Sequence, residues 1–398
     1  NFSTGNATLV PEWDDFKDGL YYTLHSQDDL TLAVRSNPYG VKYAGDIVIP
    51  STRAELTVDG VSGFVLCTDL TSVSIPSTVT RIGSSAFRNC TGLTTIDIPS
   101  SVTRIDGSAF ASCSNLNNVT LRNGLEYIGS AAFSECTSLE NVTIPASVTT
   151  LEDYIFDDCS ALANIVVDGN NTTYDSRNNC NAIIETATNR LVHGCYNTVI
   201  PNTVTTLGRD AFYGRTRLTQ TSIPSSVTAM EEDVFYGTGL TSIVVPSSIT
   251  HIGSNAFAHC LNLEKADIRG SNQTYGQSAF SNCPNLTRVK VAVVNPAAIT
   301  ANVFSNRTNA TLYVPQGARD SYLVMDYWQD FQQIKEYPDH DVNQDGEVDV
   351  VDVVDVAEPG GYTPEGLQEA NHSMDKLDIA LQIAEYILRA ESMNREGG

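Results

Sequence analysis

The sequence lacks any long apolar run. Its longest apolar stretches, such as "SYLVM" at residues 321–325 and "IALQIAEYIL" at 379–388, fall well short of the roughly 18 to 20 residues that would span a bilayer. We therefore expect no membrane-spanning segment. A polar, glycine-containing segment follows Asn1, with neither an initiating methionine nor a basic start and apolar signal core. We interpret the chain as a mature or trimmed form of an exported protein, which predicts an extracellular or cell-surface location.

Basic residues are scarce. There are 23 Lys and Arg against 47 Asp and Glu, which gives a net charge of −24. Nucleic-acid affinity depends on clustered Lys and Arg, so this balance argues against a nucleic-acid partner. The acidity is also uneven. Residues 339–398 hold 8 Asp and 7 Glu against 1 Lys and 2 Arg, so these 60 residues carry 12 of the 24 net negative charges. We therefore interpret the C-terminal segment as a separate unit.

The common signatures of catalysis are missing too. No His-x-x-x-His or Cys-x-x-Cys pair has zinc-ligand spacing, and no glycine-rich phosphate loop follows a strand. The six histidines are scattered, and serine and threonine recur at repeat positions that suit solvated turns. We therefore predict a protein that is not an enzyme, with no catalytic residues.

What the sequence does contain is a repeat of 23 residues. The clearest copy is "IPSSVTRIDGSAFASCSNLNNVT", which starts at Ile98. A phenylalanine recurs twelve positions into each row and a cysteine recurs fifteen positions in. The rows start at Ile75, Ile98, Leu121, Ile144, Ile200, Ile223, Val245 and Ile268; the phenylalanines are Phe64, Phe87, Phe110, Phe133, Phe156, Phe212, Phe235, Phe257 and Phe280; the cysteines are Cys67, Cys90, Cys113, Cys136, Cys159, Cys260 and Cys283.

Such a repeat predicts a stack of coils. A 23-residue unit cannot bury its own apolar side, whereas stacked coils turn each column into a continuous internal ladder. The segment "LTTIDIP" at 93–99 alternates apolar and polar residues, which indicates a strand with one buried face that ends at Pro99. The segment "GSSAF" at 83–87 suits a single helical or 3₁₀ turn on the opposite side. We predict an α/β repeat solenoid whose parallel strands lie about 4.8 Å apart.

The repeat resembles a known family. Its pattern "IPSSVTxIGxxAFxxCxxLxxV" is similar to the BspA-like, or Treponema-type, leucine-rich repeats of bacterial surface proteins, over about residues 60–335. The resemblance implies a leucine-rich-repeat-like solenoid and a role in adhesion.

Three segments depart from the repeat. Between residues 167 and 199, "CNAIIETATNRLVHGC" predicts a β-hairpin that projects from the solenoid. Residues 1–59 predict two β-hairpins that form an N-terminal cap, and residues 292–337 predict a C-terminal cap made of a strand and a helix with aromatic residues. The predicted domains are therefore the cap at 1–59, the solenoid at 60–337 and the separate segment at 338–398. Caps are expected because terminal coils would otherwise expose their apolar ladders.

The nine cysteines have two interpretations. Seven of them share one column, where neighbouring side chains point the same way, whereas a disulfide needs its Cβ vectors to converge. We predict a ladder of buried free thiols that behave as small apolar residues. Only Cys180 and Cys195, on opposite arms of the inserted hairpin, could pair, and the sequence leaves both their disulfide and their free forms open.

The strand positions that face away from the core form two exposed columns. They are small and polar until the last two coils, where Lys265, Arg288 and Lys290 gather. We consider these three residues a basic patch that contacts a partner, although an ordinary solvated face is the alternative. Strong interfaces usually contain aromatic or arginine anchors.

The C-terminal segment contains "DVNQDGEVDVVD" at 341–352, which has the spacing of a calcium-binding loop. Oxygen-bearing side chains alternate around Gly346, as in a loop that wraps Ca²⁺, and a backbone carbonyl supplies a further ligand. Without a cation, each pair of like charges about 5 Å apart would cost roughly 3 kcal/mol. We predict a Ca²⁺ site, with an acidic solvated linker as the alternative. Its ligands would be Asp341, Asn343, Asp345, Glu347 through its carbonyl, Asp349 and Asp352.

This loop followed by a helix resembles half of a type I dockerin. Pro338 prevents a helix from leading into the loop, which distinguishes it from an EF-hand. A second half, which includes "EANHSMDKLDIALQIAEYIL" at 369–388, has Leu367 where the first ligand belongs and His372 where glycine belongs, so we predict that it keeps only its helix. The resemblance implies a small helical calcium-loop domain that binds a cohesin-type module, another scaffold or a domain of the same chain.

Two functions remain open at this point. The first is a non-enzymatic extracellular adhesion protein whose repeats bind a protein or glycan, such as a host extracellular component. The alternative is an assembly component of a carbohydrate-degrading complex, in which the dockerin-like segment is the functional part and the repeats are a spacer.

Overall fold

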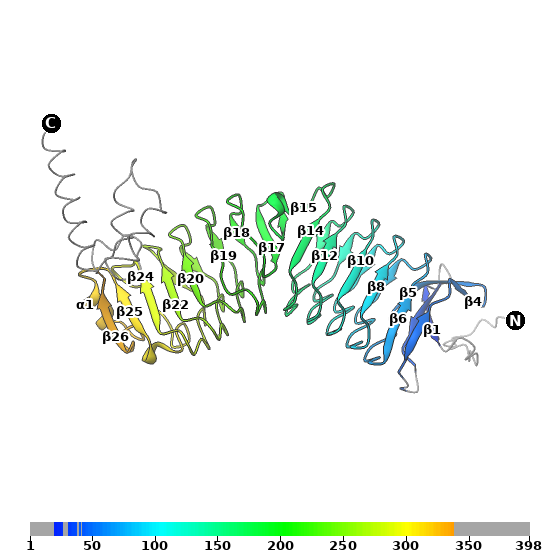
Figure 1. Ribbon diagram of the computed structural model, residues 1–398, viewed down its shortest axis with the longest axis horizontal. Coiled ribbons are helices and arrows are strands. Elements are labelled where there is room, and N and C mark those ends of the chain that lie inside the picture. The colour runs from blue at the N-terminus through cyan, green and yellow to red at the C-terminus, as the bar shows by residue number, and fades with distance from the viewer. Residues whose placement is uncertain (1–19, 27–30, 38–39, 41, 338–398) are drawn as a thin grey trace, which may run out of the picture. The chain divides into compact units, whose positions relative to one another are not determined.

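The computed structural model describes residues 20–26, 31–37, 40 and 42–337. These residues form two compact units. Unit 1 comprises the described residues up to 221 together with 231–239, and unit 2 comprises 222–230 together with 240–337. Each unit is a stack of coils with parallel strands and little helix (Figure 1), so the predicted solenoid is confirmed.

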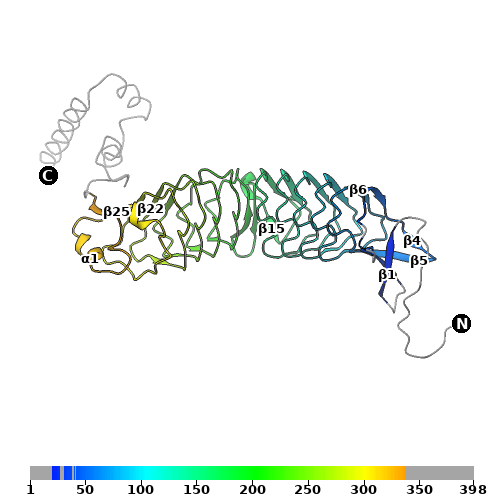
Figure 2. The ribbon, with the colours of Figure 1, turned by 90° about the horizontal axis from the view of Figure 1, so that it is seen from below.

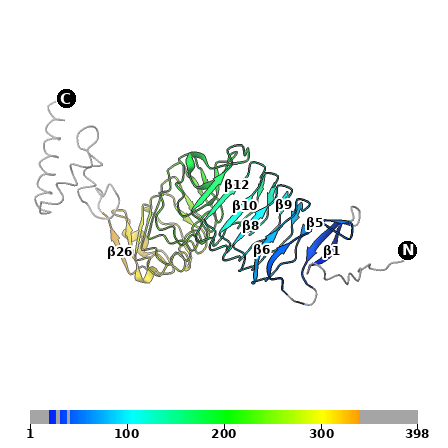
Figure 3. The same ribbon diagram turned by 45° about the vertical axis from the view of Figure 1, so that its right-hand side comes forward.

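In unit 1, each regular coil contributes strands to two walls (Figure 3). One wall is a four-stranded parallel sheet in the order β14, β12, β10, β8, and the other runs from β5 (Leu56–Val61) through short strands to β13. The pairing keeps the repeat in register, since Asn118 lies opposite both Thr95 and Asn141. The first wall contains β8 (Thr95–Ile98), β10 (Asn118–Leu121), β12 (Asn141–Ile144) and β14 (Asn164–Val167); the second contains β7 (Arg81–Ile82), β9 (Arg104–Ile105), β11 (Tyr127–Ile128) and β13 (Thr150–Leu151).

The longer strands form for the reason that the sequence indicates. Residues of β8, β12 and β14 alternate strictly between exposed and buried, as an apolar–polar alternation requires. The proline that follows begins a turn, because the Pro99 carbonyl accepts a hydrogen bond from the Val102 N–H at 3.0 Å. The same bond recurs at Pro145, Pro201, Pro224 and Pro246. The proline therefore both ends the strand and starts the return of the chain.

The third side of each coil is a run of turns and not the single helical turn that we predicted. Ser85 and Asn89 have left-handed backbone conformations, with φ of 56° and 60°, which a helix cannot contain. The N–H groups of Ser85, Phe87 and Asn89 donate to carbonyls 22 positions later, at 2.7–3.0 Å. The turns are therefore bonded from coil to coil, and each such bond runs from the earlier coil to the later one. We call this side the turn side.

Phenylalanine rings and thiols fill the core behind the turn side. The rings of Phe64, Phe87 and Phe110 stack with centroids 5.0 and 5.1 Å apart, close to the spacing of the strands. All nine cysteines are free and buried, as the ladder interpretation predicts. Their role is more than apolar filling, because five of the thiols donate to the carbonyl of a phenylalanine in the preceding coil at 2.9–3.2 Å; the donors are Cys90, Cys113, Cys136, Cys159 and Cys283.

The N-terminal cap has the first of the two predicted β-hairpins and only part of the second. Strands β1 (Tyr21–Ser26) and β2 (Thr31–Arg35) form the expected antiparallel hairpin, and β4 (Thr52–Arg53) pairs antiparallel with β5 (Leu56–Val61). However, β3 (Gly45–Val48) pairs in parallel with β6 (Leu70–Ser74), and β5 pairs in parallel with β7. The parallel ladders thus already include strands before residue 60. The second hairpin was wrong in part because β3 bonds to the following coil.

The insertion forms a hairpin, but the hairpin is part of the stack. Strand β16 (Ala182–Glu185) pairs antiparallel with β15 (Tyr174–Asp175) and with β17 (Arg190–Gly194), and β17 pairs in parallel with β18 (Thr206–Leu207). The hairpin side chains Ile183 and Cys195 belong to the core of unit 1, so the segment does not project as we predicted.

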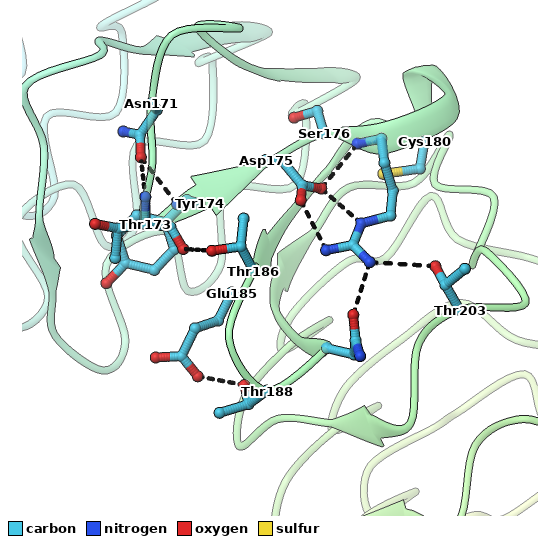
Figure 4. Close-up of polar contacts among 12 residues, drawn as sticks. Asn171, Thr173, Tyr174, Asp175, Ser176, Cys180, Glu185, Thr186, Thr188 and Thr203 are labelled. Carbon is cyan, nitrogen blue, oxygen red and sulfur yellow. Dashed lines mark hydrogen bonds and ion pairs between the residues drawn. The ribbon is translucent and has the colours of Figure 1, made fainter.

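Polar contacts fix the outer part of the insertion (Figure 4). The Arg177 guanidinium binds the Asp175 carboxylate through two nitrogens, at 2.7 and 2.8 Å, and also contacts Thr203. Asn171, which is buried, accepts hydrogen bonds from the N–H groups of Thr173 and Tyr174 at 2.9 Å. A 3₁₀ turn, η1 (Arg177–Asn179), leads into β16.

Unit 2 repeats the same plan (Figures 1 and 2). Its sheet runs in the order β20, β22, β24, β25, β26, and its short strands run β19, β21, β23. The strands are β19 (Ala229–Met230), β20 (Ser242–Val245), β21 (His251–Ile252), β22 (Lys265–Ile268), β23 (Thr274–Tyr275), β24 (Arg288–Val291), β25 (Thr311–Val314) and β26 (Gln333–Glu336).

The C-terminal cap contains the predicted strand β25 but less helix than we expected. Helix α1 covers only Arg319–Leu323, a second 3₁₀ turn η2 covers Arg307–Asn309, and the chain ends its described part with β26. The buried Tyr322 and Trp328 close the core, with ring centroids 5.2 Å apart and Trp328 Nε1 donating to the Ala297 carbonyl. The aromatic residues lie in the segment that we predicted as a cap. Their helical setting was wrong because most of them lie in turns after α1.

Candidate binding surface

The outer face of the longer strands is the surface that we expected to bind partners. In unit 1 the side chains of β8, β10, β12 and β14 that point away from the core are mostly exposed. They are the small polar residues Thr95, Asp97, Asn118, Thr120, Asn141 and Thr143, followed by Asn164 and Val166. We call this face, in either unit, the strand face.

Much of the strand face of unit 1 is bonded to itself. Asn164 donates from Nδ2 to Asn141 Oδ1 at 2.7 Å, one strand along. Arg122 holds the Asp97 carboxylate through two hydrogen bonds, at 2.7 and 2.8 Å. The Arg122 hydrogen bond lowers the pKa of Asp97. This part of the face therefore presents hydrogen-bonding groups without an excess of one charge.

The predicted basic patch lies on the strand face of unit 2, on neighbouring strands. Lys265 on β22 is opposite Arg288 on β24, and Lys265 is exposed. The Arg288 guanidinium lies over the Tyr313 ring, 4.6 Å from its centroid. The structure therefore brings two of the three predicted residues together, with an aromatic ring beside them.

Lys290, the third predicted residue, is only 3% exposed and was wrong as a contact residue. Its ammonium group lies 4.3 Å from the centroid of the Tyr337 ring. Tyr337 follows β26 directly, and its hydroxyl bonds to the Val291 carbonyl. The aromatic residues of the C-terminal cap thus cover Lys290, and the repeat pattern gave no sign of this because it ends before the cap.

Lys335 is a basic residue that the sequence analysis missed. It lies on β26 opposite Tyr313 on β25, and it is exposed. We had placed this stretch in a helix. The stretch "QQIKEY" at 332–337 does not alternate apolar and polar residues, so the sequence gave no signal of another strand there. We define the basic patch of unit 2 as Lys265, Arg288 and Lys335, with Tyr313 beside them.

The cysteines do not form a reactive site. Burial raises the pKa of Cys159 and of Cys283 to about 12 in each case, so their thiols stay protonated. Cys180 and Cys195 are both free and buried, and Cys195 Sγ lies 2.9 Å from the Ala163 carbonyl oxygen. In the structure these two cysteines therefore do not form a disulfide.

The predicted calcium ligands from Asp341 to Asp352 lie outside the described residues. Among the residues that the structure describes, no three His, Cys, Asp or Glu side chains are grouped closely enough to hold a metal ion. Within that same part of the chain, no helix is long and apolar enough to cross a membrane.

The repeats match a known family. The model of the BspA type leucine rich repeat region matches in six copies, at residues 60–183 and 193–311. These residues make up more than half of the chain. The chain belongs to the BspA-type leucine-rich repeat family. The gap between the two matched segments falls on the inserted hairpin of this BspA-type protein.

Solved structures share its fold. A leucine-rich repeat protein from Eubacterium ventriosum is 21% identical with a TM-score of 0.58, over 80% of this chain and 91% of that chain. One from Bacteroides ovatus is 24% identical with a TM-score of 0.55, over 81% and 88%. The pneumococcal vaccine antigen PcpA is 18% identical with a TM-score of 0.54, over 81% and 98%. Among curated proteins, none matches this BspA-type chain.

Proposed function

We propose that this BspA-type protein is a non-enzymatic binding or adhesion protein at a bacterial cell surface or outside the cell. Its membership of the family supports this role, as does the likeness of its fold to a pneumococcal vaccine antigen. The partner is a protein or glycan, such as a component of a host's extracellular matrix.

The basic patch of unit 2 is the observation that carries the proposal. Arg288 beside Tyr313 provides the arginine and aromatic anchors that binding interfaces favour. Lys265 and Lys335 flank this pair on neighbouring strands, and both are exposed. A basic patch on a protein with a net charge of −24 favours a partner region that carries carboxylate or sulfate groups.

Binding to immobilised matrix proteins and to sulfated or sialylated glycans tests this proposal. Lys265→Ser with Arg288→Ser introduces the kind of small residue that the other coils carry in this column, such as Ser242. We expect this variant to lose at least tenfold in affinity for the partner that the unchanged chain retains. Arg217→Ser, an exposed arginine in unit 1, is the control. Equal binding by all three proteins would contradict the proposal.

The C-terminal segment carries a second proposal, that residues 341–352 bind Ca²⁺. The spacing of its oxygen ligands around Gly346 supports this site. Calorimetry on the full chain should show one site for Ca²⁺, and Asp345→Ala should abolish it. Heat of binding that is unchanged in Asp345→Ala would contradict the site.

The same loop favours the alternative function, assembly through a cohesin-type module. A pull-down with the full chain should then retain a cohesin module in Ca²⁺ and release it in a chelator. The Asp345→Ala variant should fail to bind, while the Lys265→Ser, Arg288→Ser variant should bind normally. Retention of no cohesin module would leave adhesion as the function.

A further inference from the structure

Three neighbouring coils of unit 1 differ from all the others on the turn side. Tyrosine or acidic residues occupy most of the positions around the phenylalanine there, whereas the same positions in the other coils hold mainly serine, alanine, glycine or asparagine and include a single acidic residue, Glu135. The tyrosines are Tyr154, Tyr213 and Tyr236, and the acidic residues are Asp153, Asp157, Asp158, Asp210, Glu232 and Asp233. We call this set the acidic tyrosine edge. It lies wholly within unit 1.

The fold does not require these residue types. The coil that contains Phe110 builds the same turns with Ser108, Ala111 and Ser112, and Ser108 has φ of 57° where Asp210 also has 57°. The inter-coil bond is also the same, since the Asp210 N–H donates to the Glu232 carbonyl as in other coils. The coil of Phe110 thus shows that small residues suffice for these turns, and the acidic tyrosine edge needs an explanation other than folding.

Two of the carboxylates are placed at a cost to stability. Asp210 is 1% exposed, and both of its carboxylate oxygens lack a hydrogen-bond partner. Asp157 is 6% exposed, and its Oδ1 lacks one too. A buried carboxylate without partners destabilises a protein. Groups held in unfavourable environments are more often found at functional sites than elsewhere.

The surroundings of these carboxylates are negative. Burial, then the charge of Asp233, raises the pKa of Asp210 to about 7. Burial, then Asp210, raises the pKa of Asp157 to about 8, although Arg215 acts the other way. Arg209, a partly exposed cation next to Asp210 in the sequence, already pairs with Glu232 at 2.6 Å. The edge therefore contains more carboxylates than the chain's own cations neutralise.

Aromatic rings lie beside these carboxylates. The rings of Tyr213 and Tyr236 stack in parallel, with centroids 4.6 Å apart and planes within 4°. Tyr154 is 37% exposed, and its hydroxyl contacts Arg209. A ring face flanked by carboxylates attracts an ammonium or guanidinium group. The chain uses this arrangement internally, since the Arg104 guanidinium lies 3.5 Å from the centroid of Tyr127, which is hydrogen-bonded to Glu152.

We infer that the acidic tyrosine edge binds a basic segment of a partner protein, through lysine or arginine side chains placed on the tyrosine rings between the carboxylates. A metal ion fits less well, because within the described residues no three acidic side chains converge closely enough to ligate one. This surface is separate from the strand face and has the opposite charge to the basic patch, so it would bind a second kind of partner.

Fluorescence anisotropy of a labelled hexa-arginine peptide with the full chain tests the inference. The variant Tyr213→Ser with Tyr236→Ser changes no charge and introduces the residue that Ser134 and Ser281 provide at the same turn position. We expect it to weaken peptide binding about fivefold to tenfold, as the loss of two aromatic contacts with cations predicts. The matched control is Tyr196→Ser, which should bind like the unchanged chain.

A second pair of variants separates a defined site from general attraction of charge. Asp153→Ser with Asp158→Ser removes two exposed carboxylates of the edge, and Glu126→Ser with Glu140→Ser removes two elsewhere on unit 1. The acidic segment 339–398 is present in every variant and cancels from the comparison. We expect the first pair to weaken binding at least tenfold and the second pair less than twofold.

Three results would overturn the inference. The first is an equal loss of peptide affinity in the two double carboxylate variants, and the second is unchanged peptide binding in the double tyrosine variant. The third is displacement of the peptide by 1 mM Ca²⁺ that requires Asp153 and Asp158. Thermal unfolding of each variant shows whether it is folded. If the tyrosine variant does not fold, the carboxylate pairs decide the outcome alone.

Discussion

At the scale of single residues, Arg215 shows how the insertion changes the core. It occupies the column that cysteine holds in most coils, and it is fully buried. Its Nη1 donates to the Phe156 carbonyl at 2.8 Å, the bond that a thiol makes elsewhere, and its Nε donates to the Gly194 carbonyl at 3.0 Å. The longer side chain thus spans the extra layer that the hairpin adds.

Replacement of Arg215 should therefore be costly. We expect Arg215→Ala to lower the free energy of unfolding of unit 1 by at least about 3 kcal/mol, because two buried carbonyls lose their donor. Arg215→Cys should be almost as unstable, since a thiol cannot reach the Phe156 carbonyl across the hairpin. Arg217→Ala is the control and should stay within about 0.5 kcal/mol. Denaturant unfolding measures all three, and a stable Arg215→Cys would contradict this account.

Asp210 should make stability depend on pH. Its folded pKa of about 7 lies above its ordinary value of 3.8. Its protonated form therefore stabilises the fold fully below pH 4, and this stabilisation is lost as the pH rises to 7. We expect Asp210→Asn to match the unchanged protein at pH 4 and to exceed it by at least about 1 kcal/mol at pH 8. Asp320→Asn, on an exposed side chain, is the control in thermal unfolding. The same difference at both pH values would contradict the assignment.

His193 was not identifiable as a core residue from the sequence. It lies within the inserted hairpin, is 1% exposed, and meets the edge of the Phe156 ring at 85° with centroids 5.7 Å apart. Burial, together with the charges of Arg215 and Arg190, lowers its pKa to about 3. Its column is evident only when the hairpin is known to be part of the stack.

At the scale of elements, the repeat made the strands predictable and the turns not. The alternation of apolar and polar residues specified β8, β12 and β20 closely, because the burial of one strand face leaves few alternatives. The turn side has small residues that tolerate several conformations. Its left-handed residues at Ser85 and Asn89 are held by bonds to the next coil, and a single row does not contain that information.

A left-handed position should favour glycine. Ala131 has φ of 56° in the turn side of its coil. We expect Ala131→Gly to raise the free energy of unfolding by about 0.5–1 kcal/mol, because glycine adopts this conformation without steric strain. Ala146 is not among the residues with positive φ, so the control Ala146→Gly should lower the free energy of unfolding. Thermal unfolding compares them, and a destabilised Ala131→Gly would contradict the conformational argument.

Some residues of the candidate sites could be predicted from the sequence and others could not. Lys265 and Arg288 could be found because they interrupt a column of small residues. The sequence gave no reason to leave Lys290 out of the basic patch, because Tyr337, which covers it, lies beyond the last repeat. The acidic tyrosine edge was visible as residue types, but only the structure showed that Asp157 and Asp210 are buried without hydrogen-bond partners for three of their oxygens.

At the scale of the whole molecule, net charge should dominate the response to salt. With −24 charges the chain repels itself in the folded state. An increase in NaCl from 10 to 500 mM shortens the range of this repulsion from about 30 Å to about 4 Å. We expect the thermal midpoint to rise by several degrees. Choline chloride should act alike, which would exclude a specific sodium site, and a falling midpoint would contradict the argument.

The hydrogen bonds of the turn side give the stack a direction. On this side the N–H groups of each coil donate to the next coil, so the turn side of an N-terminal end presents acceptors, that of a C-terminal end presents donors, and a cap made for one cannot close the other. In the first coil of unit 1, the Lys42 ammonium donates to the Val65 carbonyl at 2.9 Å. Near the end of unit 2, the Ser305 hydroxyl accepts from the Asn282 N–H at 2.7 Å. In unit 1 a lysine thus caps the acceptor end of the ladder, and in unit 2 a serine caps the donor end.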